Sequence, residues 1–102
     1  MKLRINQSSI RIRLGKQDIQ ELKEQRQVKN ELLFPGGQKL IYQLEIGASF
    51  HASFDKKRLN VTIPEKESNN WLNSDKLAIE TKLSRKGKGE LVLFIEKDLH
   101  DL

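Results

Sequence analysis

Residues 52–64 read ASFDKKRLNVTIP, and residues 3–14 read LRINQSSIRIRL. In both stretches apolar residues alternate with polar ones on either side of a polar turn, which is typical of a half-buried β-hairpin. The apolar period then lengthens over residues 16–25 and 65–73, which predicts a short amphipathic helix after each hairpin. Alternation resumes after each helix and is broken by a glycine-containing turn, so a second hairpin is expected there.

The two halves of the chain match in pattern and in order. An offset of 49 residues places Ile12 on Val61 and Leu22 on Trp71. The closing strands match at an offset of 51, and we assign the two-residue difference to the preceding turn, where length changes cost little. Residue identity is low, and any alternating β protein gives some such match. A unit this short cannot bury its own apolar face, which favours two copies that share one interior.

We therefore predict an α+β, mostly β fold: a compact barrel-like antiparallel sheet from two tandem ββαββ units with pseudo-twofold symmetry. Residues 1–102 form a single domain, with internal repeats at 1–48 and 49–98 and a tail at 99–102. Hydrophobic residues make up 36% of the chain and charged residues 32%. The resulting shortage of core atoms favours a thin architecture such as a barrel.

Several classes of protein are disfavoured by composition. The chain has no cysteine, which excludes disulfides, thiolate metal sites and a cysteine nucleophile. The longest wholly apolar run is residues 91–95, far too short to span a bilayer, and the charged N-terminus does not fit a signal peptide. We expect a soluble cytoplasmic protein without a membrane partner.

Part of the second half resembles a known fold. Residues 58–64 (RLNVTIP), the short helix and residues 74–80 (SDKLAIE) resemble the AbrB-type swapped-hairpin family, which carries Ile-Pro, one helix and then Gly-Asp-Lys-Leu. Ser74 replaces the usual glycine. In that family two chains interlock hairpins into a barrel and bind DNA through basic residues. The resemblance implies that this chain supplies both copies itself, as other cradle-loop barrels do.

A second resemblance covers the whole chain. The segments KLRI at residues 2–5, SIRIRL at 9–14 and IEKD at 95–98 resemble a family of small uncharacterised bacterial proteins. That resemblance supports a unit fold and implies no activity.

Three arginines form the first candidate site. Alternation places Arg4, Arg11 and Arg13 together on the outer face of the first hairpin. The counterparts in the second half are neutral: Ser53, Asn60 and Thr62. Arginine forks suit phosphate oxygens, so the face could contact a nucleic-acid backbone or an acidic protein surface, or it could simply be solvated. The lack of an interleaved aromatic residue disfavours stacking on single strands.

A second basic group surrounds the last glycine turn and comprises Lys82, Arg85, Lys86 and Lys88. The spacing around Gly87 and Gly89 does not fit a phosphate-binding loop. We interpret these residues as a device that keeps a strand end soluble.

An apolar strand face forms the second candidate site. Val92 and Phe94 point away from Leu91 and Leu93, so both faces of their strand are apolar, and Ile41 is the equivalent of Val92 in the first half. Either a helix covers this outer face, or Ile41, Val92 and Phe94 form a patch for a protein partner or a second copy of the chain.

No catalytic, cofactor-binding or metal-binding site is predicted. His51 and His100, the only two histidines, are far apart and too few for a metal site. Acidic residues near the helices, such as Asp18, are better explained by helix-start electrostatics than by acid–base chemistry. Trp71 is expected to plug one end of the barrel. We therefore predict a non-catalytic binding or interaction module, with AbrB-like DNA or RNA binding through the basic hairpin as the alternative.

Overall fold

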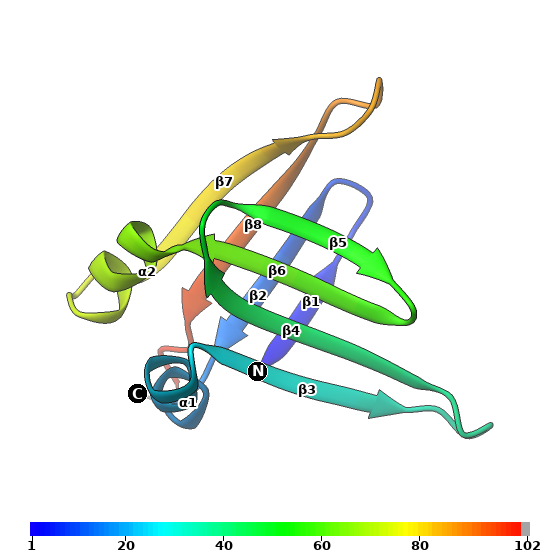
Figure 1. Ribbon diagram of the computed structural model, residues 1–102, viewed down its shortest axis with the longest axis horizontal. Coiled ribbons are helices and arrows are strands. Elements are labelled where there is room, and N and C mark those ends of the chain that lie inside the picture. Colours follow the sequence, from blue (N-terminus) through cyan, green and yellow to red (C-terminus); the bar gives the residue numbers. More distant parts are fainter. Residues whose placement is uncertain (101–102) are drawn as a thin grey trace.

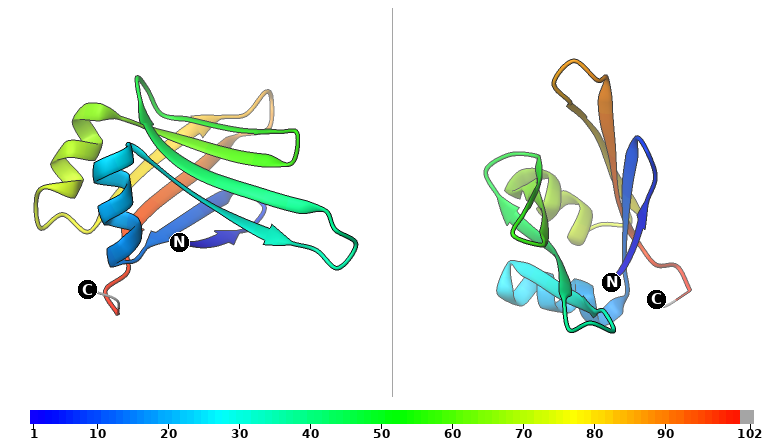
Figure 2. Two further views of the ribbon diagram at one scale, coloured as in Figure 1. Left: turned by 60° about the horizontal axis from the view of Figure 1, so that its bottom comes forward. Right: turned by 90° about the vertical axis from the view of Figure 1, so that its right-hand side faces the viewer.

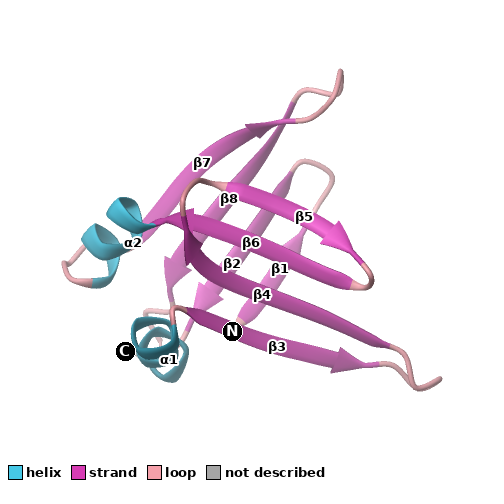
Figure 3. Cartoon of the chain, in the orientation of Figure 1, coloured by secondary structure: helices cyan, strands magenta, loops and turns pink. Residues whose placement is uncertain are grey.

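The computed structural model describes residues 1–100, which contain eight strands and two helices (Figure 1). Their order is β1 (Lys2–Ile5), β2 (Ser9–Leu14), α1 (Lys16–Gln25), β3 (Gln27–Leu33), β4 (Lys39–Gly47), β5 (His51–Asp55), β6 (Arg58–Pro64), α2 (Glu65–Leu72), β7 (Ala78–Ser84) and β8 (Glu90–Lys97). The predicted order of elements is confirmed, and residues 101–102 of the predicted tail lie outside the described residues. Figure 3 shows that strands make up most of the chain.

The strands form two four-stranded sheets, each built from two hairpins that are distant in the sequence. Sheet A has the order β1-β2-β8-β7, and sheet B has the order β3-β4-β6-β5. Within every hairpin the strands are antiparallel, but the central pairs β2–β8 and β4–β6 are parallel. The predicted antiparallel sheet is therefore replaced by two mixed sheets, because the hairpins meet through strands that run in the same direction.

The predicted barrel is wrong. In residues 1–100 no strand of sheet A pairs with a strand of sheet B, so β1, β7, β3 and β5 each keep one free edge. Both helices pack at one end of the two sheets (Figure 2, left). The helices contribute Leu22 and Trp71 to the core between the sheets at that end.

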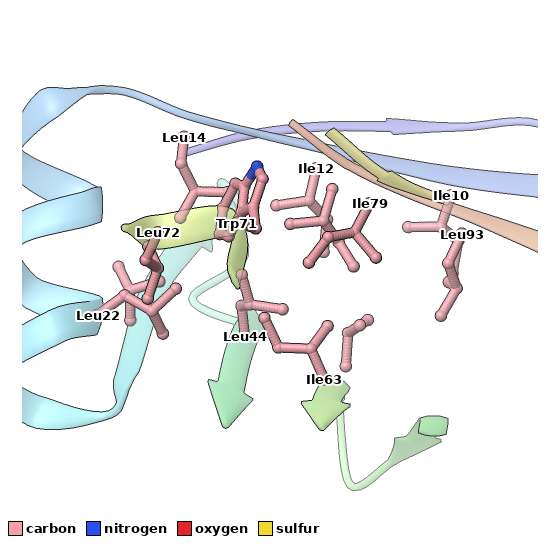
Figure 4. Close-up of a cluster of buried hydrophobic side chains, with 13 residues drawn as sticks. Ile10, Ile12, Leu14, Leu22, Leu44, Ile63, Trp71, Leu72, Ile79 and Leu93 are labelled. Atoms are coloured by element: carbon pink, nitrogen blue, oxygen red, sulfur yellow. The ribbon is translucent and has the colours of Figure 1, made fainter. Parts of the chain in front are cut away.

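The core lies between the sheets, next to the helices (Figure 4). Its buried hydrophobic members are Ile10, Ile12, Leu14, Leu22, Val28, Leu44, Val61, Ile63, Trp71, Leu72, Ile79, Leu93 and Ile95. Trp71 is fully buried, and its indole nitrogen donates a hydrogen bond to the Leu77 carbonyl over 3.0 Å. The prediction of Trp71 as a core residue at one end of the molecule is confirmed, although no barrel surrounds it.

The two-residue difference between the halves lies elsewhere than expected. The second hairpin turns have matching hydrogen bonds, Phe34 N to Gln38 O and Arg85 N to Gly89 O, both 2.8 Å long. These two turns are already 51 residues apart, so the offset changes from 49 to 51 before them. The extra residues lie instead in the connection from α2 to β7, because α2 ends at Leu72 and β7 begins only at Ala78.

Candidate functional site

The outer face of sheet A brings the three predicted arginines together. Arg4 on β1 lies opposite Arg11 on β2, and Lys2 lies opposite Arg13. These four residues and Leu3 line a surface hollow of about 220 Å³. The placement predicted from alternation is thus what the structure shows.

Two carboxylates, one on β8 and one just after it, neutralise much of this basic face. Glu96 lies beside Arg13 in the parallel ladder, and its Oε1 is 3.0 Å from Arg13 Nη2 and 3.8 Å from Arg11 Nε. Lys2 Nζ lies 3.2 Å from Asp98 Oδ2. Within residues 1–100, Arg4 is the one cation of the four that forms no ion pair.

An aromatic side chain also lies on this face, contrary to the sequence-based expectation. Phe94 is the cross-strand neighbour of Arg11, whose guanidinium carbon lies 4.6 Å from the centre of the ring. The two residues are 83 positions apart, so only knowledge of the parallel β2–β8 pairing could have predicted the contact.

The structure separates the predicted apolar patch. Ile41 lies on β4 in sheet B, whereas Val92 and Phe94 lie on β8 in sheet A. Val92 and Phe94 are half-buried, and Arg11 rather than a helix covers Phe94. The structure therefore differs from both predicted alternatives: neither described helix covers Phe94, and Ile41 does not share a patch with Val92 and Phe94.

The outer face of sheet B is polar and internally hydrogen-bonded. Gln43 is 8% exposed and accepts a hydrogen bond of 3.0 Å from Arg58 Nη1. Glu45 accepts hydrogen bonds from Asn60 over 2.9 Å and from Thr62 over 3.2 Å. These bonds hold Gln43 and Glu45 in place. The same face also carries a hollow of about 510 Å³, to which Ser53, Asp55 and Lys56 contribute.

The end of the molecule opposite the helices carries an apolar hollow of about 270 Å³. Ile5 from sheet A and Leu40, Phe54 and Leu59 from sheet B line this hollow, which we call the apolar mouth. Ile5 is 59% exposed and Phe54 is 63% exposed. Alternation predicted these side chains to be core residues, and the sequence contains no signal that the sheets stay apart around them.

The same end carries most of the unbalanced charge. We define the hairpin tips as residues 6–8, 34–39, 55–58 and 84–90, which all point away from the helices (Figures 1 and 2). Their charged residues are Lys39, Lys56, Lys57, Arg58, Arg85, Lys86 and Lys88 with Asp55 and Glu90. Seven cations and two carboxylates give the hairpin tips a net charge of +5, which equals the formal net charge of the whole chain. The rest of the chain is therefore balanced.

Two acidic residues near the chain ends have structural partners. Asp18 Oδ2 accepts a hydrogen bond of 3.0 Å from Gly15 N at the start of α1, as the helix-start interpretation predicts. The hydrogen bond from Lys2, followed by that from the His100 backbone, lowers the pKa of Asp98. Within residues 1–100 no group of three or more His, Cys, Asp or Glu could hold a metal ion. Neither described helix is long and apolar enough to cross a membrane.

Comparison with known proteins gives one match. The model of a family described as "Family of unknown function (DUF7009)" matches residues 1–102. No curated protein and no solved structure matches the chain.

Proposed function

We propose that this chain, which belongs to the DUF7009 family of unknown function, is a non-catalytic binding module whose docking site is the apolar mouth. The proposal is carried by the exposure of Ile5 and Phe54 on facing sheets at the end away from the core. Apolar side chains that stay exposed together typically mark interaction sites. The hydrogen bonds that Gln43 and Glu45 accept from neighbouring side chains support a structural rather than a catalytic role for these two residues.

An uncharged apolar dye tests the mouth as a binding site. We expect Nile red fluorescence to increase with the wild-type protein and to fall strongly in Phe54→Ser, which removes an aromatic wall of the hollow. Leu99→Ser is the matched control, because Leu99 is also 63% exposed but lies beyond β8. Equal dye binding by the wild type and Phe54→Ser would contradict the proposal.

A second candidate function is nucleic-acid binding through Arg4, Arg11 and Arg13. The contact between Arg11 and Phe94 favours it, since cation and aromatic ring together suit nucleic-acid bases and phosphates. The Glu96 ion pairs oppose it. Nucleic-acid binding is proposed from the sequence. So are the AbrB-type resemblance, a bacterial origin and a cytoplasmic location.

Chromatography on heparin and on duplex DNA tests this second candidate. Salt-sensitive retention should be lost when all three arginines are replaced by serine, and it should increase in Glu96→Gln, which frees Arg11 and Arg13. If neither the triple arginine substitution nor Glu96→Gln alters retention, the outer face of sheet A is not the surface that binds nucleic acid.

We also propose that the two ββαββ units arose by duplication. Ile12 pairs with Ile95 in sheet A, and Val61 pairs with Leu44 in sheet B. Offsets of 49 and 51 residues convert the first pair into the second. The same offsets convert the order of sheet A into that of sheet B read in reverse.

A further inference from the structure

The tip between β5 and β6 keeps two lysines in an unfavourable backbone conformation. Asp55 pairs with Arg58, so the loop has two residues, Lys56 with φ of 51° and Lys57 with φ of 65°. Two-residue turns with positive φ at both positions strongly favour Asn-Gly. Lysine has no such preference, and conformational cost at a surface position is an indication of function.

These lysines are adjacent to the apolar mouth. Phe54 and Leu59, on the two strands of the same hairpin, line the hollow on the inner side. The neighbouring β3–β4 tip adds the exposed side chains of Leu33 and Phe34. Its Lys39 is paired with Glu31, at 3.6 Å, and so does not count among the uncompensated cations. Within residues 1–100, Lys56, Lys57, Lys86 and Lys88 form no ion pair. This end of the molecule therefore combines exposed apolar side chains with uncompensated positive charge.

The size of the mouth restricts what can occupy it. Pockets that enclose small molecules measure roughly 300–1,000 Å³, and the mouth, at about 270 Å³, is smaller and open. Its occupant therefore enters only in part and belongs to a larger body. A second copy docked mouth to mouth would bring two sets of cationic tips together, which is repulsive.

An anionic lipid surface can accommodate both the exposed apolar side chains and the positive charge at this end. Acyl chains accept the apolar side chains, and headgroup phosphates accept the lysines. A nucleic acid would satisfy the charges and leave Ile5, Leu33 and Phe54 exposed. We propose that the hairpin tips and the apolar mouth dock on an anionic lipid bilayer without crossing it, an inference that rests on the mouth being the docking site proposed above. This proposal departs from the expectation of no membrane partner that was drawn from the sequence.

Cosedimentation with vesicles tests this inference. We expect the full chain to bind phosphatidylglycerol-containing vesicles and not vesicles of pure phosphatidylcholine. Lys56→Asn/Lys57→Gly should weaken binding by roughly 25-fold, since each lysine near an anionic surface contributes about fivefold. That variant should also have a higher Tm than the wild type, so the loss cannot be attributed to misfolding. The control is Lys23→Gln/Lys66→Gln, which removes the same charge from the exposed helices and should bind normally.

Insertion is measured separately. A Phe54→Trp reporter should show a blue shift of its emission on anionic vesicles, measured against the buried Trp71 that every variant shares. Absence of vesicle binding by a protein that still binds Nile red at the mouth overturns the lipid proposal and leaves the binding module intact. Vesicle binding without a blue shift of the Phe54→Trp emission also overturns the lipid proposal. So does a protein that does not bind vesicles but is retained on duplex DNA through Lys56 and Lys57.

Discussion

At the scale of single residues, Glu96 and Asp98 determine how much positive charge sheet A presents to solvent. Glu96 is shared by Arg11 and Arg13, and Asp98 is paired with Lys2. Both carboxylates lie on or next to β8, which is joined to β2 across a parallel ladder. The face that looks strongly basic in the first fourteen residues is therefore mixed in the folded protein.

The carboxyl of Asp98 should make stability depend on pH. Because the Lys2 hydrogen bond lowers its pKa from the usual value of 3.8, ionised Asp98 stabilises the folded chain above that value. This contribution disappears as the pH falls through the folded-state pKa. Asp98→Asn should be less stable than the wild type at neutral pH, and urea unfolding should show the difference shrinking under acid conditions. A difference that does not change with pH would contradict the assignment.

Gly47 is required by a close contact rather than by its backbone angles. A Cβ atom at this position would lie 2.7 Å from Thr62 Cγ2, and the hydroxyl of Thr62 is fixed by its hydrogen bond to Glu45. Gly47→Ala should destabilise the chain by about 1–3 kcal/mol, measured by urea unfolding. Gly36→Ala is the control, because no atom lies within 4 Å of its added Cβ. Equal effects of the two substitutions would show that Thr62 can move away freely.

At the scale of elements, alternation and helical period were sufficient to locate the strands and helices. The helix predicted over 16–25 coincides with α1, and the turns around Gly36 and Gly87 are where expected. The position of the length difference was not predictable, because Val28 matches an apolar residue at either offset, Leu77 at 49 and Ile79 at 51. Periodicity identifies the face of a strand, but it does not identify which strand lies beside it.

The β5–β6 tip is expected to gain stability when its lysines are removed. Each non-glycine residue in the left-handed region costs roughly 1–2 kcal/mol, and asparagine and glycine tolerate that region better. Lys56→Asn/Lys57→Gly should therefore raise the free energy of unfolding by about 1 kcal/mol, which thermal unfolding can measure. Lys23→Gln/Lys66→Gln should leave the Tm nearly unchanged. A lower Tm for the tip variant would mean that the lysines make contacts that compensate for their conformation.

At the scale of the whole molecule, the shared interior was predictable and its openness was not. Pattern matching placed Ile12, Val61, Leu44 and Ile95 in one core, where they are. Closure of a barrel depends on whether edge strands meet, and no local pattern encodes that distance. Alternation within one hairpin was enough to group the three arginines correctly. It could not show that the sheets stay apart at the far end, so Ile5 and Phe54 of the apolar mouth were predicted to be core residues.

A circular permutant tests whether the two units are interchangeable in order. The offsets place Leu99 and His100 on Ala48 and Ser49, and Met1 on Phe50. Joining His100 directly to Met1 and opening the chain before Phe50 should therefore preserve the fold. We expect an unchanged circular dichroism spectrum and a single cooperative unfolding transition. Loss of cooperative unfolding would show that the connection between the units cannot be exchanged with the ends.

The cationic tips also displace the centre of charge from the centre of mass. Outside the hairpin tips, basic and acidic residues are equal in number, so the net charge acts at the end that carries the apolar mouth. A negatively charged body then exerts a torque on the protein and turns this end toward itself before contact. The torque acts over about 8 Å at physiological salt. Collisions with such a body are therefore pre-aligned.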